Sequence, residues 1–68
     1  MRVFVNEKAV EIGDNADLIS VLEKMDVQSD RRGIAVAVND RVVRRADWRD
    51  HHVEAGDRIE IIQATQGG

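Results

Sequence analysis

One short segment of this sequence has the apolar spacing of an α-helix, and it limits the folds that are open to the chain. Four apolar residues recur at positions i, i+3, i+4 and i+7, on one helix face: Leu18, Val21, Leu22 and Met25. They predict a helix of about nine residues, which is too short to be stable alone in water. Its apolar face must therefore pack across another element, and the rest of the chain has the pattern of β-strands.

The two ends of the sequence alternate between inward and outward positions with the period of two that is typical of strands. Residues 1–5 and 10–12 predict an N-terminal hairpin with a turn between them. Residues 58–62 predict the last strand, in which Ile59 and Ile61 face the core and the residues between them face outward.

Residues 34–38, Ile-Ala-Val-Ala-Val, have the densest strand pattern in the chain. Large and small residues alternate there, so Val36 and Val38 should face the core. The small residues Ala35 and Ala37 then lie on the opposite face, where they would allow another molecule to approach closely.

Residues 39–57 are predicted to form a turn, a short strand and an irregular stretch. A turn signal at residues 39–40 leads to a short return strand at residues 42–43. Residues 44–57 are polar and irregular, and we expect Trp48 and Val53 to anchor them by packing.

The resulting order of elements is β-β-α-β-β-β. It favours a two-layer α+β fold with a mixed sheet of four to five strands and one helix packed across it. We expect the first and last strands to lie side by side, parallel, at the centre of the sheet. Residues 1–64 then form one domain, and residues 65–68 extend from it as a flexible tail.

Size and composition exclude several classes of protein. A chain of 68 residues has room for one small core, but not for a core and a deep catalytic cleft together. The absence of Cys excludes a disulfide framework, a thiolate metal site and a Cys nucleophile. No segment has the pattern of a signal peptide or a membrane span, so we expect a cytoplasmic protein with no membrane partner.

Charge is distributed unevenly along the chain. Six Arg and three Asp give residues 31–52 a net charge of +3, which leaves −6 for the remainder of a chain whose net charge is −3. An isoelectric point of about 5.2 and only two aromatic residues argue against nucleic acid as a partner. We interpret the Arg-rich segment as a solvated loop region that could dock an acidic partner.

No residues of the chain form a candidate catalytic or metal site. His51 and His52 are adjacent, so their side chains diverge on a regular element, and no Cys is present to complete a zinc site. We interpret them as solvated loop residues. The helix carboxylates Asp17, Glu23 and Asp26 are interpreted as a cap and a solvated face.

Residues 65–68, Thr-Gln-Gly-Gly, follow directly after the last strand. Glycine has no Cβ and loses the most entropy on ordering, so Gly67 and Gly68 cannot strengthen the strand. They predict a thin, mobile end that threads a narrow tunnel in a partner and presents the Gly68 carboxylate there. Four extended residues reach roughly 13 Å. The alternative is a frayed terminus without a function.

Together these features resemble the ubiquitin-like β-grasp fold and, within it, the ThiS family of sulfur carrier proteins. The likeness covers the whole chain and rests on six motifs: Gly33-Ile34-Ala35-Val36-Ala37-Val38-Asn39, Val42-Val43, Arg45, Trp48, Gly56-Asp57-Arg58-Ile59 and Gln66-Gly67-Gly68. One departure is Arg44, at a position where family members commonly have proline, and it concerns only the local loop.

The resemblance implies a role in building the thiazole ring of thiamine. A ThiF-like adenylyltransferase would adenylate Gly68 with ATP and Mg²⁺, a sulfur-donor protein would supply sulfur, and a ThiG-like thiazole synthase would receive the thiocarboxylate. Gln66 and Gly67 would occupy the partner's active site. The chain has no Gly-rich phosphate loop, no carboxylate cluster for a metal and no Cys, so we expect a carrier without a cofactor of its own rather than an enzyme.

Two apolar residues are candidates for docking these partners. Phe4 and Ile62 are expected to point away from the helix on neighbouring strands. An exposed apolar pair beside the root of the tail would mark a docking face.

Other functions stay open at this point. The small subunit of molybdopterin synthase uses the same terminal chemistry but usually has a longer chain. A ubiquitin-like modifier would become joined to lysines of target proteins, and a pure binding module would have an inert tail. Neither the sulfur donor nor the oligomeric state follows from the sequence.

Overall fold

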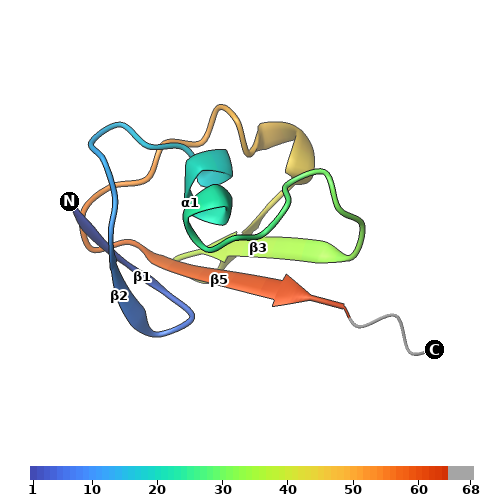
Figure 1. The fold of residues 1–68 in the computed structure, drawn as a ribbon, viewed down its shortest axis with the longest axis horizontal. Helices are drawn as coiled ribbons and strands as arrows, with labels where there is room; N and C mark the ends of the chain where they lie inside the picture. Colours follow the sequence, from blue (N-terminus) through green and yellow to red (C-terminus); the bar gives the residue numbers. More distant parts are fainter. Residues whose placement is uncertain (65–68) are drawn as a thin grey trace.

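The computed structural model describes residues 1–64 as one sheet with a helix across it (Figure 1). The elements follow the expected order and have these bounds: β1 Arg2–Val5, β2 Lys8–Glu11, α1 Leu18–Lys24, β3 Ile34–Val38, β4 Arg41–Val43 and β5 Arg58–Gln63. A short 3₁₀-helix, Arg45–Asp47, lies within the segment that was expected to be irregular throughout. No helix in this part of the chain is long and apolar enough to cross a membrane.

The sheet has the strand order β2-β1-β5-β3-β4. Strand β1 pairs with β5 in parallel, with Val5 opposite Ile59, and the other pairs are antiparallel. The expected parallel pairing of the first and last strands is confirmed. The middle position belongs to β5 alone, because β3 pairs with it on the other side over five residues, from Val38 opposite Ile59 to Ile34 opposite Gln63.

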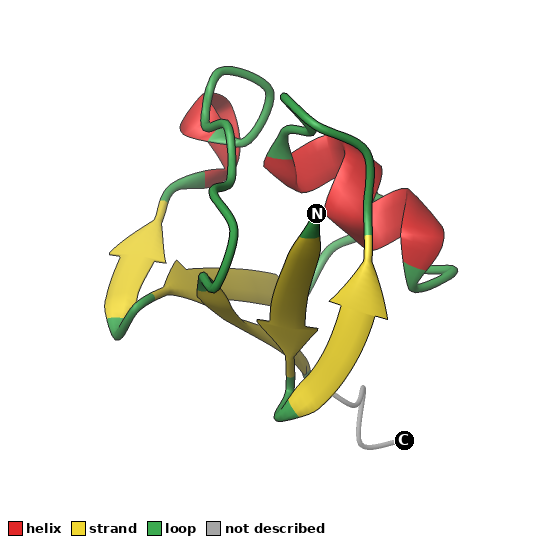
Figure 2. Ribbon diagram, turned by 90° about the vertical axis from the view of Figure 1, so that its left-hand side faces the viewer, coloured by secondary structure: helices red, strands yellow, loops and turns green. Residues whose placement is uncertain are grey.

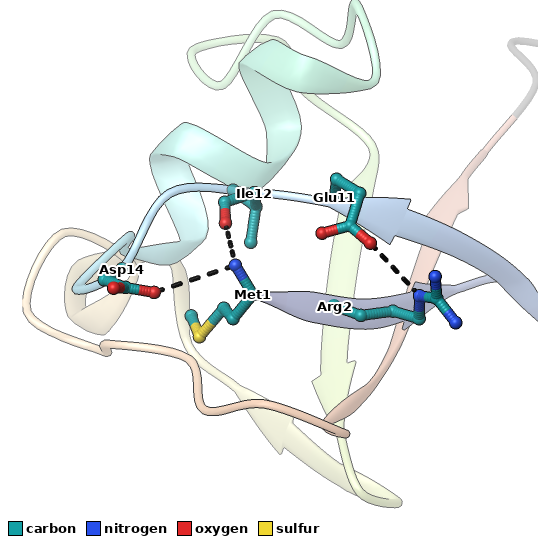
Figure 3. A network of polar contacts seen from close by, with 5 residues as sticks. All are labelled: Met1, Arg2, Glu11, Ile12 and Asp14. Atoms are coloured by element: carbon teal, nitrogen blue, oxygen red, sulfur yellow. Dashed lines mark hydrogen bonds and ion pairs between the residues drawn. The ribbon is translucent and has the colours of Figure 1, made fainter.

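Both hairpins turn through two residues with positive φ. Asn6 and Glu7 have φ of 49° and 71° between β1 and β2, and Asn39 and Asp40 have 51° and 71° between β3 and β4. Tight hairpin turns of this kind match the twist of the strands, and Asn adopts positive φ more readily than most residues. Polar contacts also hold the first hairpin together at the end away from its turn (Figure 3). There the Met1 ammonium donates to the Ile12 carbonyl at 2.7 Å, and its nitrogen lies 3.6 Å from an Asp14 carboxylate oxygen.

The helix begins at Leu18 because Asp17 caps it. The Asp17 carboxylate accepts the Ser20 N–H at 2.8 Å, which satisfies one of the free donors of the first turn. The helix spans seven residues instead of the expected nine, since Met25 leaves helical geometry and Asp26 has φ of 62°.

The core lies between the helix and one face of the sheet. Figure 2 shows the helix and the 3₁₀-helix on the same side of the strands. The buried apolar residues come from β1, α1, β3, β5 and the segment between β4 and β5: Val3, Val5, Leu18, Val21, Leu22, Val36, Val38, Trp48, Val53, Ile59 and Ile61. The inward positions predicted for the strands, and the packing roles of Trp48 and Val53, are thereby confirmed.

Candidate functional site

The part of the chain that the structure describes ends just before residues 65–68, the segment that carries the predicted reacting residue. Strand β5 ends at Gln63, and the structure describes one residue more, Ala64. The predicted site residues Gln66, Gly67 and Gly68 lie outside the described residues. We call the end of β5 and Ala64, from which these residues continue, the root of the C-terminal segment.

On its β3 side, this root is held by one further backbone hydrogen bond beyond the strand. The Ala64 N–H donates to the Gly33 carbonyl at 2.7 Å. Gly33 has φ of +79°, and a Cβ built on it would lie 3.4 Å from the Ala64 Cβ. Position 33 therefore requires glycine mainly for its backbone conformation, while the close approach leaves little space for a side chain.

On its β1 side, β5 is held by a side chain. The Asn6 amide donates to the Ile61 carbonyl at 3.2 Å, and its oxygen accepts the Ile61 N–H at 2.9 Å. Asn6 thus continues the pairing of β1 with β5 after the β1 backbone has turned away. This contact was not predicted from the sequence, in which Asn6 belongs to a turn. The one signal for it is the residue type, an amide that can donate and accept at once.

Phe4 and Ile62 are exposed on the face of the sheet opposite the helix, as predicted. They do not form one pair. Phe4 lies opposite Arg58, at the beginning of β5, whereas Ile62 lies opposite Ala35, four residues further along the strand. The two side chains line different surface hollows, and only that of Ile62 includes Ala64. Of the two, Ile62 is thus the residue beside the root.

Ile62 has apolar neighbours on this outer face. Ala35 lies opposite it on β3, and Ala37 lies opposite Val42 on β4. Val42 is 77% exposed, which is more than Ile62 at 59%. We call Ala35, Ala37, Val42 and Ile62 the outer-face patch. Val42 was not among the docking residues predicted from the sequence, although its alternation with the half-buried Val43 was a signal for its exposure.

The Arg-rich segment is partly engaged within the domain. The Arg44 Nε lies 3.5 Å from the Asp47 Oδ2. The Arg45 guanidinium donates to backbone carbonyls of the loop before β3. Arg58, which follows the segment, lies 3.2 Å from Asp40. The docking of an acidic partner by this segment stays a prediction. The contacts of Arg45 give it a structural role that was not predicted from the sequence.

The polar residues near the helix start are structural in this part of the chain. The Ser20 N–H hydrogen bond holds the pKa of Asp17 below its ordinary value. Asp17 also pairs with His52 in an isolated backbone bridge, and the His51 carbonyl accepts the Leu18 N–H at 3.1 Å. Within residues 1–64, no three His, Cys, Asp or Glu side chains are grouped in a way that could hold a metal ion.

The architecture defines a class of protein. A five-stranded mixed sheet with one helix across it, and with the last strand in the middle, is a ubiquitin-like β-grasp domain. Here the middle strand and Ala64 immediately precede residues 65–68 in the sequence.

Comparison with known proteins identifies the family. The sequence pattern of the ThiS family matches residues 1–68. The sulfur carrier protein ThiS of Escherichia coli (strain K12) is 31% identical over 68 residues, and the alignment covers all of both chains. This chain belongs to the ThiS family of sulfur carrier proteins, as the sequence resemblance implied.

Solved structures agree with this fold. The crystal structure of a thiamine biosynthesis protein (ThiS) from Geobacter metallireducens superposes with a TM-score of 0.79 at 24% identity, with both chains covered completely. An NMR solution structure of a thiamine biosynthesis protein from the same organism gives 0.79 at 25% identity, covering all of this chain and 88% of the other.

Proposed function

We propose that this protein carries sulfur for thiazole formation in thiamine biosynthesis, and that Gly68 is the residue that carries it. The observation that supports this most strongly is the match of the ThiS family over the whole chain, residues 67 and 68 included. The structure adds a firmly held base, because β3 pairs with β5 as far as Gln63 and the Asn6 side chain holds Ile61 on the β1 side.

The chemistry requires activation of the Gly68 carboxylate. A carboxylate oxygen attacks the α-phosphorus of ATP, the bond to pyrophosphate breaks, and an acyl-adenylate forms. The terminal sulfur of a persulfide on the donor protein then attacks the acyl carbon, and AMP leaves, which gives an acyl disulfide between carrier and donor. A second thiol of the donor protein attacks the donor's own sulfur in that bond, forms a disulfide with it and releases the terminal sulfur on the carrier. The product is a thiocarboxylate, whose sulfur a thiazole synthase receives.

The carrier contributes the carboxylate, and its partners contribute the catalytic groups. The chain has no Cys for a persulfide and no Gly-rich phosphate loop in its sequence. We therefore assign ATP and Mg²⁺ to a ThiF-like adenylyltransferase and the acceptor reaction to a ThiG-like synthase. Gln66 and Gly67 give a slim approach to either active site, and four extended residues span roughly 13 Å.

The outer-face patch, together with Phe4, is the proposed docking surface for the activating enzyme. Ile62 and Val42 are large exposed apolar side chains, and the alanines between them allow close contact. Each Å² of apolar surface that such a contact removes from water contributes about 25 cal/mol before the costs of association.

The test is intact-mass spectrometry of the protein after mixing with ATP, Mg²⁺ and a ThiF-like enzyme. We expect an acyl-adenylate first and, once a sulfur donor is added, free protein whose mass has increased by the exchange of one oxygen for sulfur. Isopeptide-linked conjugates on a denaturing gel would instead identify a modifier. Failure to form the adenylate would contradict the proposal.

A further inference from the structure

Arg45 fastens the loop that precedes β3 to the rest of the domain. Its two terminal nitrogens, Nη1 and Nη2, donate to the backbone carbonyls of Ser29 and Arg31 respectively. These carbonyls lie 16 and 14 positions earlier in the sequence. A guanidinium presents its donors in a rigid planar fork, so one side chain can hold two carbonyls of the same loop.

The position of Arg45 is itself set by the core. Its guanidinium carbon lies 4.5 Å from the centre of the Trp48 ring, within the range of a cation–π interaction. Trp48 is 1% exposed, and its indole N–H donates to the Val43 carbonyl at 2.8 Å. A buried ring with its own hydrogen bond has little freedom to move, so Arg45 has a rigid support.

The loop that Arg45 holds reaches the root of the C-terminal segment two residues later. Gly33 follows Arg31 closely, and its carbonyl accepts the Ala64 N–H. Arg45 also lines the same surface hollow as Ile62 and Ala64. A continuous set of contacts therefore runs from Trp48 through Arg45 and the loop to Ala64.

We infer that Arg45 is a positioning residue that sets where the chain leaves the sheet. By holding the Ser29 and Arg31 carbonyls, it keeps Gly33 in place to bind the Ala64 N–H. Ala64, the last described residue, then has a defined position in the hollow that Ile62 also lines. This inference rests on the proposed function, because that defined position matters only if a partner must capture the residues that follow.

The expected kinetic consequence follows from preorganisation. If the hydrogen bond from Ala64 to Gly33 opens more often, a smaller fraction of the carrier holds Ala64 in the position that the partner requires. Apparent affinity falls by that fraction, whereas a carrier that is already bound reacts normally. Loss of Arg45 should therefore raise KM for the carrier and leave kcat unchanged.

The experiment compares the wild-type protein with Arg45→Ala and Arg45→Lys. Amide hydrogen exchange of Ala64 is measured on the isolated protein, and adenylation kinetics are measured with ATP and a ThiF-like enzyme. We expect Arg45→Ala to speed exchange at Ala64 and to raise KM roughly three- to tenfold. For Arg45→Lys, the Ala64 exchange rate and the KM should lie between those of the wild type and Arg45→Ala, because an ammonium lacks the planar fork that holds two carbonyls at once.

Arg49→Ala is the matched control. It removes the same charge close to Trp48, and Arg49 makes no ion pair or side-chain hydrogen bond within residues 1–64. It should change neither Ala64 exchange nor KM. An equal rise of KM in Arg49→Ala would show that charge alone matters and would overturn the assignment.

Gly33→Ala tests the same hydrogen bond from its other side. The substitution strains a backbone with φ of +79° and places a Cβ 3.4 Å from Ala64. It should raise KM as Arg45→Ala does, and the double variant should show less than the sum of the two effects, because both act through one contact. Full additivity would argue against a common path.

The outcomes separate this inference from the proposed function. If the wild-type protein is not adenylated, the proposed function fails. If it is adenylated and Arg45→Ala leaves Ala64 exchange unchanged, the positioning role is wrong. It is also wrong if exchange becomes faster while KM stays at the wild-type value.

Discussion

The side chain of Asn6 forms two hydrogen bonds with the backbone of Ile61, 55 positions away in the sequence. A turn residue of the first hairpin thus completes the pairing of the middle strand just before the chain reaches its C-terminal segment. Since β1 pairs with β5 only at Phe4 and Val5, this amide extends the contact between the two strands toward the root.

Substitution of Asn6 should therefore destabilise the domain. Asn6→Gly keeps the positive φ of 49° accessible but removes both hydrogen bonds and leaves the Ile61 N–H without its partner. We expect a loss of about 1–3 kcal/mol in the free energy of unfolding, measured by urea denaturation. Glu7→Gly is the control, since it makes the same kind of change at the other turn position, whose φ is 71°. An equal loss in both variants would refute a specific role for the Asn6 amide.

The cap at Asp17 predicts a pH dependence of stability. Its folded-state pKa is lowered, chiefly by the Ser20 N–H hydrogen bond, so its contribution is present above the ordinary carboxyl value of 3.8 and is lost as pH falls through the folded-state value. Asp17→Ala should cost about 0.5–2 kcal/mol at neutral pH. Asp17→Ser keeps an oxygen acceptor that does not titrate, so its stability should fall less between neutral and acidic pH. Identical acid profiles for Asp17→Ser and the wild type would exclude this carboxyl as a source of the pH dependence.

The proposed docking surface predicts losses of affinity without losses of stability. Phe4→Ala and Ile62→Ala should each weaken binding to the activating enzyme by more than about 1 kcal/mol, measured by calorimetry. Both side chains are exposed, so thermal unfolding should change little. Lys8→Ala, on the edge strand β2, is the control. Normal affinity in both variants would remove the docking assignment, and a loss in Ile62→Ala alone would restrict it to the outer-face patch.

The proposed role of Gly68 predicts sensitivity to the length of the C-terminal segment. Deletion of Gly68, or addition of one residue after it, should abolish ATP-dependent adenylation, because the reacting carboxylate is then displaced by about 3.3 Å or more. The urea midpoint should stay at the wild-type value, since residues 1–64 are unchanged. Adenylation that survives either change would contradict the assignment of Gly68.

Most of the fold could be predicted because local patterns and packing agree. The alternation in residues 34–38 and 58–62 and the stripe on residues 18–25 each specify one buried face, and a single core satisfies all three. The length of the helix could not be predicted, because its end is set by the backbone at Met25 and Asp26 and not by the apolar pattern.

The candidate site was predictable only in part. Exposure of Phe4 and Ile62 follows from strand periodicity, but their separation depends on the register between β1 and β5. Register joins residues that are more than 50 positions apart, and no local pattern specifies it.

The sequence by itself determined the kinds of element, their order, their inward faces and the family, because these depend on residue type and short-range spacing. Only the tertiary structure decided that Asn6 bonds to Ile61, that Gly33 bonds to Ala64 and that Arg45 supports the loop before β3. The physical reason is that each of these contacts joins polar groups from distant segments. Such groups come within hydrogen-bonding distance only when the apolar core has already brought their strands and loops together.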